Sequence, residues 1–107
     1  MIHNYIDLHC HTIASKSKTG ESEKRNVPNK EYFLNAMHEN HVSVVAITNH
    51  NYFDSNQYES FKDNEDVIVF PGIELDIELL NKNIGHLILI SNPKGEQYTH
   101  FLEFIHK

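Results

Sequence analysis

Short apolar runs alternate with amphipathic segments along this chain of 107 residues. Runs that are rich in β-branched residues or that alternate apolar with polar positions predict β-strands at residues 4–8, 43–51, 66–75 and 84–90. Segments with apolar residues at helical spacing predict helices at residues 29–40, 54–63 and 96–105. In chain order the elements read strand, helix, strand, helix, strand, strand, helix, and the alternating first part is typical of an α/β fold.

The last two predicted strands are separated by the turn-forming sequence Asn81-Lys82-Asn83. This spacing predicts a β-hairpin in which residues 73–80 pair antiparallel with residues 84–91. Upstream of the hairpin, Asp54 is placed to cap the helix that follows it.

Aromatic and aliphatic residues recur at helical spacing in the last predicted helix. The expected buried positions are Tyr98, Phe101, Leu102 and Ile105. His100 and His106 fall largely off this stripe, so we expect them at the surface.

The end of the first predicted strand carries the pattern Asp7-Leu8-His9-Cys10-His11. Alternate side chains of an extended strand point to one face, so Asp7, His9 and His11 are expected to converge. Two neutral imidazoles two residues apart can bind one divalent ion, and an acidic neighbour supports them. The alternative is a surface strand that happens to be rich in histidine, because the chain has nine histidines and chance pairs are not rare.

Other candidate ligands stand where the remaining strands begin or end. His50 lies at the end of the second strand, and His86 lies near the start of the fourth. The break Pro71-Gly72 predicts that Glu74 lies just past the end of the third strand. Strand ends are where α/β folds build their sites. The alternatives are a solvent-facing turn acid for Glu74 and a hydrogen-bonded core residue for His86.

Taken together, these motifs resemble the first motifs of the PHP domain family, the polymerase and histidinol phosphatase superfamily. The matching segments are Asp7-Leu8-His9-Cys10-His11-Thr12, Ala46-Ile47-Thr48-Asn49-His50-Asn51, Pro71-Gly72-Ile73-Glu74 and Gly85-His86-Leu87. The resemblance implies a partial distorted β/α barrel of three to four βα units, with a β-hairpin after the third strand. It also implies a centre of two or three metals that hydrolyses phosphate esters or phosphodiesters.

The resemblance further implies roles for individual residues. His9 and His11 would hold a first metal, Glu74 would bridge it to a second, and His86 would also bind the second ion. His50 would be a ligand of a third metal, and Glu74, His9 and His11 would be the catalytic set. Mixed imidazole and carboxylate ligands suit Zn, Mn or Fe. The substrate would be a phosphorylated small molecule or a nucleic-acid phosphodiester.

The chain also departs from the family pattern. Asn49 stands where the family has aspartate, and the acid expected soon after Ala14-Ser15 is absent, the nearest being Glu21 and Glu23. Both departures argue against a third metal. Residues 1–107 would be a single PHP-like domain, truncated relative to the family, whose missing half comes from a second copy or a partner chain. The alternatives are a regulatory or assembly module with little turnover, and the N-terminal segment of a larger ATPase, polymerase or nuclease.

Composition bears on which partners and which cellular location we expect for the protein. The net charge of −6 argues against a generic nucleic-acid-binding surface, since phosphate backbones are bound mainly by Lys and Arg clusters. No apolar run approaches the length of a membrane span and the N-terminus lacks a signal pattern, so we expect no membrane association and a cytoplasmic location. The single cysteine, Cys10, is expected to be a small buried residue rather than a metal ligand.

Overall fold

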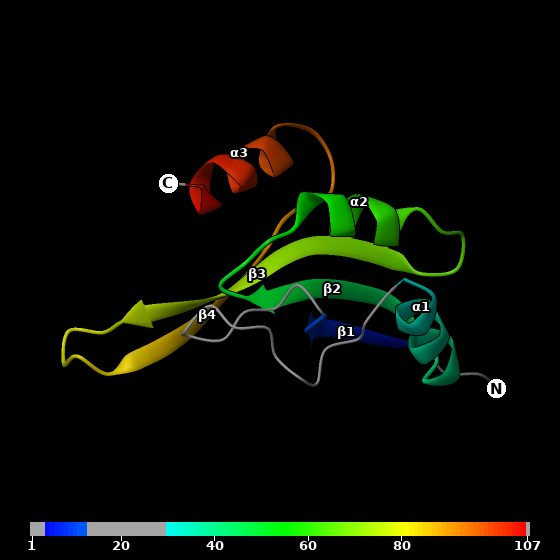
Figure 1. Cartoon of the computed structure of the whole chain (residues 1–107), viewed down its shortest axis with the longest axis horizontal. Helices are drawn as coiled ribbons and strands as arrows, with labels where there is room; N and C mark the ends of the chain where they lie inside the picture. The colour runs from blue at the N-terminus through cyan, green and yellow to red at the C-terminus, as the bar shows by residue number, and fades with distance from the viewer. Residues whose placement is uncertain (1–3, 13–29, 107) are drawn as a thin grey trace.

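The computed structural model describes residues 4–12 and 30–106. The elements in these ranges are β1 (Tyr5–Cys10), α1 (Lys30–Glu39), β2 (Val42–His50), α2 (Ser55–Lys62), β3 (Ile68–Glu78), β4 (Ile84–Ile90) and α3 (Gly95–Ile105), as Figure 1 shows. The predicted order of strands and helices is confirmed. Within the described ranges, no helix combines the length and the apolar character needed to cross a membrane.

The strands form one sheet, in the order β1-β2-β3-β4, that curls into half of a barrel (Figure 1). β1 pairs parallel with β2, and β2 pairs parallel with β3. β3 and β4 form the expected antiparallel hairpin, with Gly72 opposite Ile90 and Glu78 opposite Ile84. The α/β class and the hairpin after the third strand are therefore confirmed.

The break at Pro71-Gly72 does not end the third strand. β3 continues through both residues to Glu78, so the prediction that Glu74 lies past the strand end is wrong. Proline fixes a backbone angle that an extended strand tolerates, and the Pro71 carbonyl still accepts a hydrogen bond from the Ser91 backbone N–H at 2.9 Å. Glu74 consequently lies inside the strand, opposite His50 at the end of β2.

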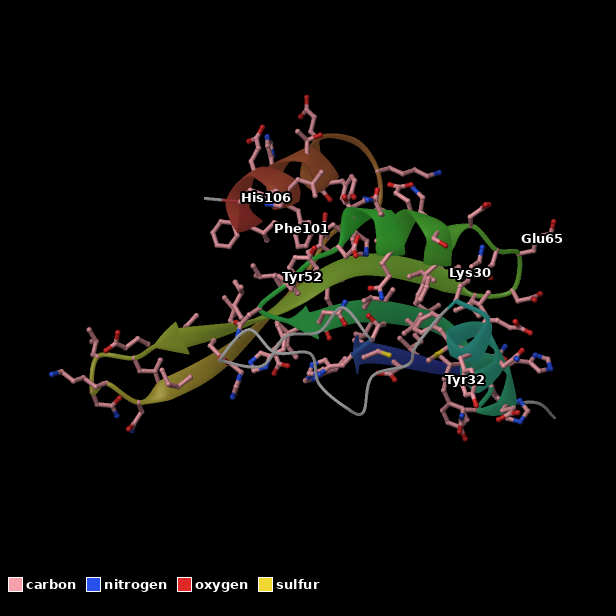
Figure 2. The ribbon with its side chains drawn as sticks, in the orientation of Figure 1. Lys30, Tyr32, Tyr52, Glu65, Phe101 and His106 are labelled. Carbon is pink, nitrogen blue, oxygen red and sulfur yellow. The ribbon has the colours of Figure 1, made fainter. Side chains whose placement is uncertain are left out.

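One face of the sheet is covered by the helices and holds the core. All three helices contribute to the same buried cluster, with Phe33 from α1, Tyr58 from α2 and Phe101 from α3. Figure 2 shows Phe101 on the side of α3 that faces the rest of the molecule, and its ring meets Phe53 edge to face at 5.2 Å between centroids. The predicted stripe of α3 is confirmed, and His100 and His106 are exposed as expected.

The opposite face of the sheet, which we call the open face, is not covered by the described helices. Strand alternation places Ile68 of β3 and Ile88 and Ile90 of β4 on this face, on the same side as Glu74. All three isoleucines are exposed, Ile68 by 59%. The open face therefore combines apolar side chains with the polar residues at the ends of the strands.

Tyr58 gives a first testable prediction. Its side chain is 1% exposed, and its hydroxyl has no hydrogen-bond partner in the described part of the chain. We expect Tyr58→Phe to raise the free energy of unfolding by about 1 kcal/mol, because a buried polar group without a partner is costly. Urea unfolding at pH 7 measures this, with exposed Tyr5→Phe as the control; a destabilised Tyr58→Phe protein would contradict the expectation.

The same residue predicts a pH dependence. Burial, reinforced by the Tyr98 and Glu59 side chains, raises the pKa of Tyr58 from 10.0 to about 12. The unfolded chain therefore loses this proton at lower pH than the folded protein does. The titration of Tyr58 therefore leaves the free energy of unfolding of the wild type unchanged below about pH 10 and lowers it as the pH rises toward 12. We expect the stability advantage of Tyr58→Phe over wild type to grow between pH 7 and pH 11.

Candidate metal centre

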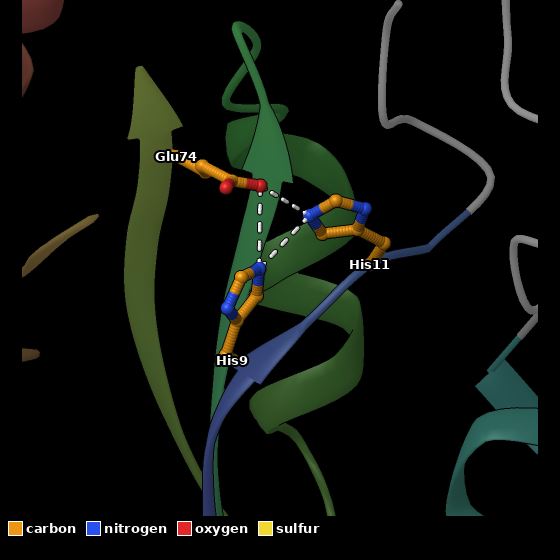
Figure 3. A group of neighbouring side chains, drawn as sticks. All are labelled: His9, His11 and Glu74. Atoms are coloured by element: carbon orange, nitrogen blue, oxygen red, sulfur yellow. Dashed lines mark hydrogen bonds and ion pairs between the residues drawn. The ribbon is translucent and has the colours of Figure 1, made fainter. Parts of the chain in front are cut away.

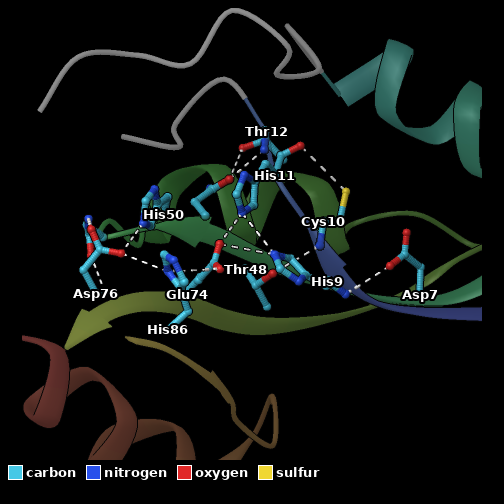
Figure 4. A network of polar contacts seen from close by, with 12 residues as sticks. Asp7, His9, Cys10, His11, Thr12, Thr48, His50, Glu74, Asp76 and His86 are labelled. Atoms are coloured by element: carbon cyan, nitrogen blue, oxygen red, sulfur yellow. Dashed lines mark hydrogen bonds and ion pairs between the residues drawn. The ribbon is translucent and has the colours of Figure 1, made fainter. Parts of the chain in front are cut away.

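Imidazole and carboxylate side chains gather where β1 and β2 end, on the open face of the sheet (Figure 4). They form two groups, and within each group one nitrogen or oxygen from every residue lies within 4.8 Å of the others. The first group is His9, His11 and Glu74. The second group is His50, Asp76 and His86. The structure thus brings together all the histidines and the glutamate that the sequence singled out as ligands.

The first group converges on one oxygen of Glu74 (Figure 3). Glu74 Oε1 lies 3.2 Å from His9 Nε2 and 2.8 Å from His11 Nε2, and the two nitrogens are 3.3 Å apart. A tetrahedral zinc ion with bonds of about 2.1 Å keeps its ligand atoms about 3.4 Å apart. The three atoms therefore have the chemistry of a metal site and lie somewhat closer together than the ligand atoms of a bound ion do.

The second group converges on one oxygen of Asp76. Asp76 Oδ1 lies 2.6 Å from His50 Nε2 and 3.0 Å from His86 Nδ1. The second oxygen of Glu74, Oε2, lies 3.6 Å from His86 Nδ1. Glu74 therefore directs one carboxylate oxygen to the first group and the other to an edge of the second.

Strand register explains why these residues meet. The parallel pairing of β2 with β3 sets His50 opposite Glu74, and the antiparallel pairing of β3 with β4 sets Asp76 opposite His86. Side chains two residues apart on a strand share a face, so Glu74 and Asp76 point the same way. Three adjacent strands thus present their ligands side by side.

Asp7 does not join the histidines that follow it. The pairing of β1 with β2 shifts register between Asp7 and Cys10, which interrupts the alternation on which the sequence prediction relied. Asp7 Oδ1 instead accepts a hydrogen bond from the backbone N–H of His9 at 3.0 Å, and Figure 4 shows its side chain to one side of the centre. The expectation that Asp7 shares a face with His9 and His11 is therefore wrong. Asp7 contacts the backbone of His9 instead.

Asn49 has a structural role on the helix side of the sheet. Its side chain is 1% exposed, and its Oδ1 accepts a hydrogen bond from the Thr12 backbone N–H at 2.7 Å. Its Nδ2 donates to Gln57 Oε1 on α2 at 3.0 Å. The Asn49 amide therefore links the segment after β1 to β2 and α2. Its oxygen accepts one hydrogen bond and its nitrogen donates the other. The acids Glu21 and Glu23, named as late candidates for a third site, lie outside the described residues.

Cys10 packs against the core cluster, although it is only half-buried. Burial, with a smaller contribution from the Asp7 charge, raises the pKa of the thiol to about 11. The thiol of the metal-free chain is therefore protonated at neutral pH. Neither of the two groups of candidate ligands in the described residues includes Cys10.

Asp76 is the member of the centre that the sequence interpretation missed. The signal was present, because Glu74-Leu75-Asp76 sets two acids on the same face of one strand. A hydrogen bond with His50, aided by one from Asn51, holds the pKa of Asp76 below its usual value. The carboxylate is therefore ionised at neutral pH, as a metal ligand must be.

No protein-family model matches the chain, and the search of curated proteins finds no match. The assignment of this centre rests on its own geometry and on the sequence motifs that build it.

Proposed function

We propose that this chain is a metal-dependent phosphoesterase of PHP type, which hydrolyses a phosphate ester or a phosphodiester. The observation that carries the proposal is the position of Glu74, with one oxygen against His9 and His11 and the other 3.6 Å from His86. A carboxylate that reaches two groups of ligands offsets the repulsion between two nearby cations. The curled half-barrel is compatible with part of a β/α barrel that carries its site at the strand ends.

The chain's own residues would do three things in this reaction. His9 and His11 sit at the end of a strand whose backbone is fixed to β2, so their imidazoles need little reorganisation to bind an ion. Glu74, whose side chain is 11% exposed, supplies negative charge between the groups. Zn, Mn or Fe would fit these donors, and when bound the ions supply an activated water and neutralise charge on the phosphoryl oxygens.

Metal content is the first test of this function. We expect protein purified without chelator to carry about one to two divalent ions per chain, because two groups of three donors are present. Elemental analysis measures the stoichiometry, and His9→Ala combined with His11→Ala should remove most of the metal from the first group. The matched control is His100→Ala with His106→Ala, which removes one exposed histidine from α3 and another from the residue after it. Metal at background level in the wild type would rule out the centre.

Hydrolysis is the second part of the test. A panel of phosphomonoesters and phosphodiesters, assayed with added Mn²⁺ or Zn²⁺, should show turnover that chelation abolishes. A protein that binds ions but hydrolyses no member of the panel would contradict the proposed phosphoesterase activity. It would not contradict the proposed metal site.

The open face favours a second candidate function, that of a metal-binding assembly module without turnover. Ile88 and Ile90 expose apolar surface near Glu74, Ile68 does so at the start of β3, and proteins seldom leave such surface uncovered. A second copy or a partner chain would cover it in this case. Bound ions without hydrolysis, combined with self-association in light scattering, would support this candidate over the enzyme.

A further inference from the structure

β4 lies at one edge of the sheet. It pairs with β3 on one side, and none of the strands in the described residues lies on its other side. Figure 1 shows the turn between β3 and β4 standing clear of the helices. The outer side of an edge strand presents unpaired backbone N–H and C=O groups, which can pair with a strand of another chain.

The hydrogen bonds of the hairpin determine which backbone groups of β4 face outward. The Ser91 N–H donates to the Pro71 carbonyl at 2.9 Å, and in an antiparallel ladder the residues that bond to the partner strand alternate with those that do not. Alternation therefore directs the backbone groups of Gly85, Leu87 and Leu89 toward β3. The residues whose backbone groups face away from β3 are Ile84, His86, Ile88 and Ile90.

β4 lacks the features by which proteins usually protect an edge strand. Residues 84–90 include no Lys, Arg, Asp, Glu or Pro, and their pairing with β3 keeps one register throughout. The other edge strand, β1, carries Asp7 and shifts register against β2. The exposed apolar side chains of β4 are those of Ile84, Leu87, Ile88 and Ile90.

We propose that β4 pairs antiparallel with β4 of a second copy of this chain, which joins the two sheets into one. When the two strands overlap fully, Leu87 lies opposite Leu87 of the second copy, and Ile84 lies opposite Ile90. His86 then lies opposite Ile88. In this register every outward-facing residue meets another outward-facing residue, so the pair can exchange about eight backbone hydrogen bonds.

The charge of the chain favours this strand as the contact between copies. Each copy has a net charge of −6, so two copies repel one another over most of their surfaces. β4 carries no acid, and its side chains set opposite one another are mainly apolar. Two copies can therefore approach along β4 without placing like charges against each other.

The pairing uses the edge of the sheet, leaves the open face uncovered and does not depend on the metal centre. Strands joined in one antiparallel sheet keep their side-chain alternation in step. The open faces of both copies would therefore lie on the same side of the combined sheet, together with their candidate ligand groups.

Sedimentation equilibrium of the whole chain, from low to high micromolar concentration, tests the dimer. We expect a reversible equilibrium between monomer and dimer that is the same with and without EDTA. Leu87→Lys should weaken dimerisation by about tenfold or more, because it sets two like charges directly opposite at the centre of the pair. The matched control is Ile68→Lys, which places the same charge on an exposed isoleucine of the open face and should leave the dimer intact.

Cysteine cross-linking tests the register without relying on the lysine variants. In a Cys10→Ser background, Leu87→Cys should form a disulfide-linked dimer on mild oxidation. The reason is that opposite residues of a non-hydrogen-bonded pair have Cα atoms about 4.5 Å apart, within the reach of a disulfide. Ile84→Cys is the matched control, because its two copies would lie six residues apart along the paired strands, about 20 Å. Combining Ile84→Cys with Ile90→Cys should restore cross-linking.

A chain that stays monomeric over the whole concentration range would overturn the proposal. A dimer weakened by Ile68→Lys and not by Leu87→Lys would also overturn it, and would place the contact on the open face. Cross-linking of Ile84→Cys as fast as that of Leu87→Cys would overturn the register. A dimer of this kind that holds no metal and hydrolyses nothing would support the pairing while contradicting the proposed function.

Discussion

Glu74→Gln is expected to reduce hydrolysis by several orders of magnitude. Its two carboxylate oxygens face different groups, Oε1 toward His9 and His11 and Oε2 toward His86, so one substitution disturbs the ligands of both ions. Glutamine keeps the size and the hydrogen-bond acceptor but removes the charge that offsets cation repulsion. Initial rates with added Mn²⁺, together with metal content, measure the effect, and a large loss in kcat/KM without unfolding is the expected result.

His50→Ala is the comparison that makes this prediction specific. His50 contacts Asp76 and belongs to the second group, so its loss leaves His9, His11 and Glu74 in place. We therefore expect a smaller loss of activity than for Glu74→Gln, accompanied by loss of one ion rather than two. Equal losses in the two variants, or normal turnover by Glu74→Gln, would refute the bridging role of Glu74.

The order of the elements could be predicted because it depends on local patterns. Apolar spacing located α1, α2 and α3 to within one or two residues, and Asp54 does cap α2, accepting a hydrogen bond from the Gln57 backbone N–H at 3.0 Å. The turn sequence Asn81-Lys82-Asn83 predicted the hairpin in the same way. Such signals lie within a few residues of the structure that they determine.

Only some of the ligand contacts could be predicted from the sequence, because these contacts depend on how the strands pair. His9, His11, Glu74 and His86 stood out as polar residues beside apolar runs, and pairing did bring them together. The shift in β1 that turns Asp7 away arises from its register against β2, which no local pattern reveals. Asp76 was overlooked although the predicted hairpin of residues 73–80 with 84–91 includes it, because only polar residues at the start or the end of an apolar run were considered as ligands, and Asp76 lies inside β3.

Gly72 shows what that dipeptide does instead of ending the strand. A Cβ atom added at Gly72 would lie 2.8 Å from the Leu89 carbonyl oxygen and 3.0 Å from the Ile47 carbonyl oxygen. Both oxygens belong to the backbones of neighbouring strands, β4 and β2, and cannot move aside as a flexible side chain can. Glycine is therefore required here for β3 to fit between its neighbours, two residues before the proposed bridging ligand.

Gly72→Ala is accordingly expected to lower the free energy of unfolding by about 2 kcal/mol or more, because the added methyl group must push two strands apart. For a domain of this size that corresponds to a fall in melting temperature of roughly 10 °C. The shift of β3 should also displace Glu74 and reduce metal content, which elemental analysis of the folded fraction measures. Gly85→Ala is the matched control in the same hairpin, since its Cβ would meet only the Leu79 side chain, at 3.4 Å. Equal melting temperatures for the two variants would contradict this prediction. They would mean that β2 and β4 do not pack closely enough against Gly72 to fix the position of Glu74 between the two ligand groups.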